Sequence, residues 1–269
     1  MSVITISRGS FSGGKMLAEC LSKTLGYRCI DREVIVERAA ARGVSQEELR
    51  DALQKPPTFL ERIQHKKYLY LVLIQAALIE EVRTGKAVYH GNAGHLLLKG
   101  GPHILRVRII APLELRLKMA QDRLKFSRAE AVDYIARMDQ DRKKWTQYLY
   151  GVDWGDASNY DIVLNLEFMD IAGACQTVSA LARQRCFEFT PCCQAAMDDL
   201  ALASRVRVEL ALSDATSHLE VEVSAKDGVV RILGSVSNMR EVQEVRRVAS
   251  AVSGIQTLDL DELVSPVRA

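Results

Sequence analysis

The spacing of apolar and polar positions divides the chain into two parts. In the first part, short apolar runs alternate with long segments whose apolar residues recur every three or four positions, as in helices. The predicted strands are residues 3–7, 87–90, 104–110 and 160–166, and the predicted helices are residues 14–25, 32–41, 63–83, 113–124, 127–150 and 170–186, with another helix beginning at residue 45. Because the chain between these strands is mostly too long for hairpins, the pattern predicts a parallel sheet covered by helices on both faces, in an α/β domain.

The second part has a different pattern. From about residue 197 we expect alternating strands, and Asp227-Gly228 is a strong hairpin turn signal between two of them. A helix over residues 238–252, with a stripe of valines, and a last strand over residues 255–260 complete a small α+β unit. We therefore expect one domain over residues 1–190 and another over residues 196–266.

Charge and hydropathy limit the partners. The 269 residues carry a formal net charge of +2, so the chain as a whole has no strong attraction for nucleic acid or for a membrane surface. The most apolar stretch, residues 68–79, contains Gln75 and is too short to span a bilayer, and the first residues lack the pattern of a signal peptide. We expect a cytoplasmic protein with no transmembrane segment and no nucleic-acid partner.

Six cysteines stand at positions 20, 29, 175, 186, 192 and 193. They contain no C-x-x-C and no histidine at the spacing of zinc ligands, which argues against a metal cluster. We expect reduced thiols, most of them packed.

A glycine-rich loop carries the main chemical signal. Gly9, Gly14 and Lys15 match the phosphate-binding pattern G-x-x-x-x-G-K-[ST], between a predicted strand and a predicted helix. Glycines allow backbone N–H groups to converge on phosphate oxygens, the helix N-terminus adds positive charge, and Lys15 would reach the terminal phosphates. Met16 stands in the place of the hydroxyl residue that would bind Mg²⁺. The alternative interpretation is an ordinary glycine-rich turn with a surface lysine.

Five segments make the interpretation specific. They are "ITISRGSFSGGK", "LGYRCIDREVI", "APLELRLKM", "ARMDQDRKKW" and "YDIVLNLEFMD". Together they resemble the cytidylate kinase-like family, small P-loop kinases related to the nucleoside monophosphate kinases. The resemblance implies a P-loop kinase-type parallel sheet and an ATP- and Mg²⁺-dependent phosphotransferase whose acceptor is a nucleoside monophosphate, with CMP or dCMP favoured, or a similar small molecule.

The resemblance also implies site residues on the donor side. Lys15 and the loop would hold the donor phosphates, and Arg116 and Arg142 would neutralise the phosphoryl group in transfer. The loop residues concerned are Gly9, Ser12, Gly13, Gly14 and Met16. Arg123 and Arg137 are weaker candidates from the same lid. The alternative for Arg137 and Arg142 is a salt-bridged, solvated helix face, because Asp133, Arg137 and Asp141 are i,i+4 neighbours.

On the acceptor side, Asp31 could orient the acceptor or a Mg²⁺-bound water, or it could be a helix N-cap. Asn92 stands where relatives often carry an arginine, which bears on acceptor choice. Magnesium could keep most of its shell as water, so Met16 does not exclude it. His90 and His95 flank this loop, and we interpret them as structural or surface residues.

The second part resembles a BON domain, from the hairpin "DGVVRILGSV", the helix after it and the segment "VSGI". This resemblance implies an accessory module with a lipid or protein partner. A basic helix face of Arg240, Arg246 and Arg247 could serve such binding, but Glu241 and Glu244 interleave with it, as on an ordinary solvated helix. The alternative for the whole chain is a nucleotide-binding regulatory protein with little turnover, in which ATP occupancy controls this domain.

Overall fold

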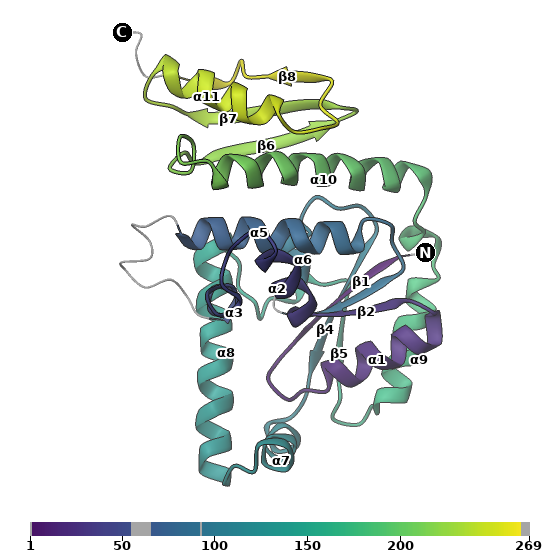
Figure 1. Cartoon of the computed structure of the whole chain (residues 1–269). Helices are drawn as coiled ribbons and strands as arrows, with labels where there is room; N and C mark the ends of the chain where they lie inside the picture. The colour runs from purple at the N-terminus through teal and green to yellow at the C-terminus, as the bar shows by residue number, and fades with distance from the viewer. Residues whose placement is uncertain (1, 55–65, 92, 265–269) are drawn as a thin grey trace.

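The computed structural model describes residues 2–54, 66–91 and 93–264 (Figure 1). It contains a large α/β domain and a smaller domain with its own sheet. A long helix lies between the two (Figure 1).

A five-stranded parallel sheet forms the centre of the large domain. Its order is β2-β3-β1-β4-β5. The strands are β1 (Val3–Arg8), β2 (Arg28–Asp31), β3 (Ala87–His90), β4 (Ile104–Ile110) and β5 (Ile162–Asn165). The predicted α/β class is confirmed, but β2 was not predicted, because it is a four-residue edge strand whose first two residues are exposed and give no apolar run.

Helices cover both faces of this sheet. On one face, Ile4 and Ile6 of β1 pack with α1 (Gly14–Leu25) and α9 (Ile171–Ala182), and on the other Val3 and Tyr89 belong to a core shared with α2 (Arg32–Ala40), α3 (Gln46–Gln54), α5 (Lys66–Val82) and α6 (Gly94–Leu97). The helices of the large domain are α1 (Gly14–Leu25), α2 (Arg32–Ala40), α3 (Gln46–Gln54), α5 (Lys66–Val82), α6 (Gly94–Leu97), α7 (Leu113–Leu124), α8 (Arg128–Tyr150) and α9 (Ile171–Ala182). The last of these is shorter than the predicted helix over residues 170–186, because Asp170 is its N-cap and a 3₁₀ turn follows at Arg185–Phe187.

Two helices project from the sheet and form a lid. A capping box at Ser127 and Glu130 starts α8, as the sequence pattern predicted. The two lid helices have a small core of Leu117, Ala120, Ala131 and Ile135, against which Phe11 of the glycine loop packs. The lid therefore rests directly on the loop. Although α8 is long, neither it nor any other helix in the described ranges is long and apolar enough to cross a membrane.

The small domain is built on a helix that was not predicted. It comprises α10 (Pro191–Leu212), β6 (Val221–Lys226), β7 (Val229–Ser235), α11 (Met239–Ser250), β8 (Thr257–Asp259) and β9 (Leu263–Val264). The predicted hairpin is confirmed, since β6 and β7 are antiparallel around Asp227 and Gly228, which both have positive φ. The expectation of strands from residue 197 is wrong. Thr190 caps α10 and Pro191 is its first residue, which favours a helix start.

Both domains share α10. Met197, Ala201, Val208 and Ala211 belong to the core of the large domain, where α10 lies along α5 (Figure 1). Leu202, Ala203, Val206 and Leu210 belong to the core of the small domain, beneath β6. A helix that is apolar on two faces has no clear amphipathic period, which explains why the pattern did not reveal it.

One pair of cysteines differs from the expectation of reduced thiols. Cys20 of α1 and Cys175 of α9 form a disulfide, so the prediction of reduced thiols is wrong for these two. The other four are free, and of these only Cys193 is buried. Pairing across a separation of 155 residues leaves no trace in local spacing.

Candidate functional site

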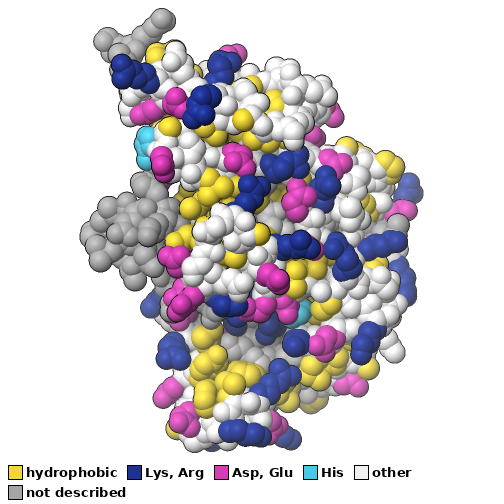
Figure 2. Space-filling view, viewed as in Figure 1, with side chains coloured by type: hydrophobic (Ala, Val, Ile, Leu, Met, Phe, Trp, Pro, Cys, Tyr) yellow, Lys and Arg dark blue, Asp and Glu magenta, His cyan; other side chains and the backbone are white. Residues whose placement is uncertain are grey.

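A cavity of about 330 Å³ opens at the carboxyl ends of β1, β2 and β3. This is where ligands bind in open parallel α/β sheets. Figure 2 shows it as a hollow in the lower half of the molecule, with Lys and Arg side chains around it. Five cationic residues and two anionic residues line it, namely Arg8, Lys15, Arg32, Arg123, Arg142, Asp31 and Glu33. The cavity is therefore suited to an anionic ligand.

The glycine loop forms one wall. Gly13 adopts the left-handed conformation with φ 86°, and Ser12 Oγ donates to the Gly9 carbonyl at 2.9 Å. A Cβ on Gly9 would lie 3.2 Å from the Arg116 guanidinium carbon, and a Cβ on Gly14 would collide with the side chain of Arg8. These two glycines thus leave room for two arginines beside the loop.

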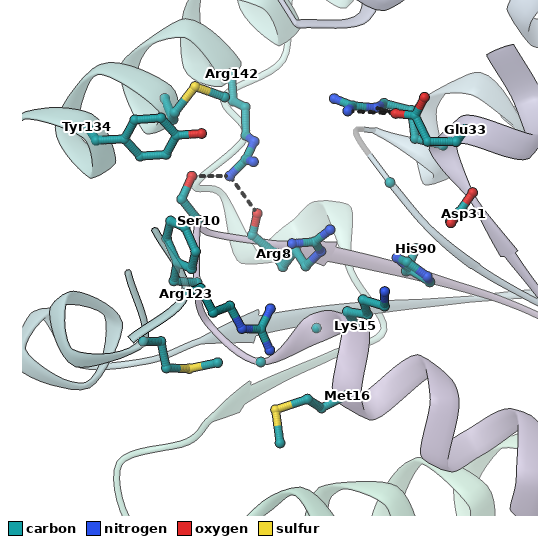
Figure 3. Close-up of a pocket in the computed structure, with 17 residues that line it drawn as sticks. Arg8, Ser10, Lys15, Met16, Asp31, Glu33, His90, Arg123, Tyr134 and Arg142 are labelled. Atoms are coloured by element: carbon teal, nitrogen blue, oxygen red, sulfur yellow. Dashed lines mark hydrogen bonds and ion pairs between the residues drawn. The ribbon is translucent and has the colours of Figure 1, made fainter. Parts of the chain in front are cut away.

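Lys15 and Met16 lie at the start of α1 and line the cavity (Figure 3). The Lys15 side chain is 56% exposed, and its only ion pair in the described ranges is a loose one of 3.8 Å with Glu19. It can therefore turn toward a phosphate at little energetic cost. Met16 presents a thioether in the position where a hydroxyl would serve a metal ion.

Asp139 joins the lid to the glycine loop. Its carboxylate accepts from the Ser10 backbone N–H at 3.1 Å, forms an ion pair with Arg116 and lies 3.4 Å from Arg142. Arg116 Nε also donates to the Ser10 carbonyl at 2.8 Å. Arg116 is thus engaged by the loop backbone and by Asp139, and it is not among the described residues that line the cavity. Asp139 lies in the segment "ARMDQDRKKW", but the sequence analysis gave it no role, because its contacts depend on the fold.

Arg142 lines the cavity from α8. Its Nη1 donates to Ser10 Oγ at 3.0 Å and to the Arg8 carbonyl at 3.2 Å (Figure 3). Burial, and then the charge of Arg8, lower the pKa of Arg142 to about 10. The group remains a cation at neutral pH, in a place where it can meet an anion.

Arg8 is another residue to which the sequence analysis gave no role. It is the last residue of β1, and its guanidinium lies in the middle of the cavity, between Arg142 and His90 (Figure 3). Its Nε is buried without a hydrogen-bond partner, and no described carboxylate forms an ion pair with it. Burial, followed by the charge of Arg32, lowers its pKa. Its position just before the glycine loop was the available signal.

Asp31, Arg32, Glu33 and His90 form the opposite edge. Asp31 Oδ1 accepts from the Val34 N–H at 3.0 Å, so this residue is an N-cap and also lines the cavity; the two alternatives are compatible. Burial and the charge of Arg8 lower the pKa of His90 to about 4, which keeps this imidazole neutral at pH 7. His90 therefore lies in the cavity as a neutral polar group.

The remaining candidates lie in different places. Arg123 lines the cavity from α7, whereas Arg137 lies over the Tyr134 ring at 5.8 Å and is not among the described lining residues. His95 is buried against Tyr160, with ring centroids 4.7 Å apart. Asn92 lies outside the described residues.

The donor set fits Mg²⁺ only as a largely hydrated ion. Within the described ranges, no three His, Cys, Asp or Glu side chains gather as a metal site. Asp31 and Glu33 nevertheless bring two carboxylates to the cavity that the glycine loop lines, and Mg²⁺ is commonly held by one or two carboxylates plus water and phosphate. Either of these residues would hold it through water.

The glycine loop between β1 and α1, the parallel sheet and the two-helix lid define a P-loop phosphotransferase fold. Residues 3–167 match the family model described as "Cytidylate kinase-like family", and residues 198–261 match that of the BON domain. The chain therefore belongs to the cytidylate kinase-like family, which is a family of nucleoside monophosphate kinase-like phosphotransferases, and it carries a C-terminal BON domain.

Known relatives agree with this assignment. The cytidylate kinase of Ignicoccus hospitalis is 27% identical over 185 residues, which cover 67% of this chain and 99% of the relative. The cytidylate kinase of Methanosarcina acetivorans is 31% identical over 167 residues, covering 61% of this chain and 87% of the relative. A crystal structure of an uncharacterized protein from Eubacterium ventriosum, at 18% identity, covers 69% of this chain and all of that protein with a TM-score of 0.55, which shows a shared fold.

Proposed function

We propose that this protein transfers the γ-phosphoryl group of ATP to a nucleoside monophosphate, with CMP or dCMP favoured. One observation carries the proposal: a single cavity joins the glycine loop and Lys15 to Arg142 of the lid and to the edge formed by Asp31 and His90. Donor and acceptor would thus meet in one place. The relatives are cytidylate kinases, which favours cytidine as the base of the acceptor.

The transfer needs cations more than a base. An acceptor phosphate oxygen is largely ionised at pH 7, so it can attack the γ-phosphorus without losing a proton first. A bond forms between this oxygen and phosphorus, and the bond from phosphorus to the leaving ADP oxygen breaks. The main obstacle is repulsion between the two phosphates. Lys15, Arg123, Arg142 and Arg8 would offset it, and bound Mg²⁺ would neutralise further phosphate charge.

Roles within the cavity follow from position. The loop amides and Lys15 would bind the donor, with Gly9, Gly13 and Gly14 giving the loop its path. Arg116 would act indirectly, by holding the loop carbonyl of Ser10. Asp31 would orient the acceptor or a water on Mg²⁺. Asn92 remains a candidate for substrate binding, and Arg137 a more distant member of the lid.

A panel of acceptors tests the proposal. Wild-type protein is assayed with ATP and Mg²⁺ against CMP, dCMP, UMP, AMP and non-nucleotide acceptors, beside a calorimetric titration with ATP. Turnover with CMP or dCMP that is lost in Lys15→Ala supports the proposal. ATP binding without turnover on any acceptor contradicts it.

A second function is supported by Met16 and α10. Met16 lines the cavity where a metal-binding hydroxyl would stand, and α10 packs into the cores of both the large domain and the BON domain. In this alternative the protein is a nucleotide-dependent regulator whose ATP occupancy controls a lipid or protein partner. A Mg²⁺ titration of phosphoryl transfer in wild type and Met16→Thr distinguishes them. A sharp gain in the threonine variant over a nearly silent wild type favours the regulator, and a modest change favours the kinase.

A further inference from the structure

Arg207, in the C-terminal half of α10, contacts both domains. Its Nη1 donates to Gln75 Oε1 of α5 at 3.0 Å, and its Nη2 donates to the Val223 carbonyl of β6 at 3.1 Å. Gln75 Nε2 in turn donates to the Leu97 carbonyl of α6 at 2.8 Å. Three hydrogen bonds therefore run without a break from the sheet of the small domain to α6 of the large domain.

The groups in this series of hydrogen bonds have few other partners. Val223 lies on β6, the edge strand of its sheet, so a carbonyl on its outer side has no neighbouring strand to bond. Leu97 is the last residue of α6, where a helix leaves carbonyls without an internal partner. Gln75 is a polar residue within the otherwise apolar middle of α5. The arginine and the glutamine thus satisfy two backbone oxygens that the secondary structure leaves open.

A neighbouring arginine behaves differently. Arg205 of the same helix also reaches α5, but it pairs with the Glu80 carboxylate at 3.1 Å. No described carboxylate forms an ion pair with Arg207, whose bonds all go to neutral oxygens. Arg205 therefore joins two helices, while Arg207 joins the β6 edge to α6 through Gln75.

The α6 helix stands next to the acceptor edge of the cavity. It begins at Gly94, three positions after Gly91, which lines the cavity beside His90. A Cβ on Gly94 or on Gly91 would collide with the ring of Tyr89, which is fully buried. This close packing gives α6 little freedom to shift without moving Gly91. The position of α6 is thus coupled to the shape of the cavity.

We propose that Arg207 is a positioning residue for the acceptor edge, and that through it the BON domain supports the reaction of the large domain. Arg207 holds Gln75, Gln75 holds the end of α6, and α6 fixes the edge at Gly91 and His90. The small domain thereby contributes to acceptor binding without touching the acceptor. The part of this inference that concerns catalysis rests on the proposed function.

The test compares three variants of the full chain. Arg207→Met keeps the stem and removes both bonds. Gln75→Glu keeps an oxygen for Arg207 but removes the N–H that holds Leu97. Arg205→Met is the matched control on the same helix. Amide exchange over residues 94–98 is measured by mass spectrometry, together with KM for CMP, the Kd for ATP and the melting temperature.

We expect faster exchange at residues 94–98 and a KM for CMP raised about three- to tenfold in Arg207→Met and Gln75→Glu, with the Kd for ATP unchanged. Arg207→Lys should bring exchange and KM part of the way back to the wild-type values. Arg205→Met should change neither exchange nor KM, even if its melting temperature falls.

Two results would overturn the inference. One is unchanged exchange at residues 94–98 in Arg207→Met, which needs no turnover to observe. The other is an equal rise of KM in the Arg205→Met control, which would mean that general loosening of α10 is the cause. A wild type that shows no turnover with any acceptor contradicts the proposed function instead, and the exchange comparison still decides whether Arg207 positions α6.

Discussion

Replacing Arg8 with methionine should make the protein more stable and less active. The aliphatic stem of Arg8 runs past Gly14, and a methionine can fill that path. What the substitution removes is a guanidinium whose Nε is buried without a partner, in a cavity that Arg32, Arg123 and Arg142 also line. The buried charge therefore lowers the stability of the folded protein, and it becomes favourable only when an anion is bound.

The surroundings of Arg8 determine how much this substitution should change stability and activity. Burial and Arg32 lower the pKa of Arg8, so the fold disfavours its charged form, and removing the charge should raise the free energy of unfolding by about 1 kcal/mol. A unit charge about 4 Å from a phosphate is worth about 4 kcal/mol at an effective dielectric constant of about 20. Because the other cations of the cavity remain, we expect part of this loss, about 10²-fold in kcat/KM for the acceptor.

Urea unfolding and steady-state kinetics with varied CMP measure both effects. Arg128→Met is the control, because Arg128 forms an ion pair with Glu114 on the lid surface and is not among the described lining residues. Arg8→Lys should recover part of the activity, since it restores the charge. A less stable Arg8→Met with unchanged kinetics would show that Arg8 is a structural cation and would refute the reasoning.

Three further predictions concern single residues. Lys15→Ala should lower the transfer rate about 10²–10³-fold, as measured in a coupled assay, and leave the melting temperature unchanged, because its side chain is 56% exposed. Arg142→Ala should lower kcat more than it weakens ATP binding, and equal losses in kcat and in calorimetric ATP affinity would contradict its assigned role. Burial, Arg106 and Arg108 lower the pKa of His95 to about 4. As the pH falls, His95 therefore becomes protonated in the unfolded chain at a higher pH than in the folded protein. The free energy of unfolding should be maximal above about pH 6.5, and the His95 share should fall by about 2 kcal/mol from pH 7 to pH 5. His90, whose pKa is lowered in the same way, contributes a fall of similar size, so His95→Phe should abolish about half of this dependence in urea titrations.

Elements with contiguous signals were predictable from sequence. The glycine loop, the capping box of α8 and the hairpin turn of the small domain each depend on neighbouring residues, and all three are present. The edge strand β2 was missed because exposed Arg28 and Cys29 interrupt any apolar run. Helix α10 was missed because burial on two faces removes the amphipathic period that reveals a surface helix.

The candidate site was predictable in its residue types but not in their arrangement. Sequence patterns pointed to a lysine and several arginines, and the fold brings Lys15, Arg123 and Arg142 to the cavity. It also turns Arg116 toward the loop backbone and Asp139, and places Arg8 in the centre. The contacts of Ser10 with Asp139 and with Arg116 join segments more than a hundred residues apart, which no local spacing can show.

Because α10 belongs to both cores, its presence should decide which N-terminal fragment of the chain can fold. A fragment ending at residue 190 loses α10 and exposes the face of α5 on which it lies. Met197 and Val208 are both buried in the core of the large domain, and burial of such side chains contributes about 1.5–3 kcal/mol each. That loss of about 3–6 kcal/mol is a large part of the roughly 5–15 kcal/mol that holds a typical domain folded.

A fragment ending at residue 213 keeps α10 on α5 and removes only the sheet and last helix of the small domain. We expect this longer fragment to stay folded and to bind ATP, with reduced solubility because Leu202, Val206 and Leu210 become exposed. The shorter fragment should unfold or aggregate at ordinary temperature. Circular dichroism melting and an ATP titration on both fragments decide the matter. A stable, ATP-binding fragment 1–190 would show that α10 belongs to the small domain alone, and that the large domain does not depend on it for its core.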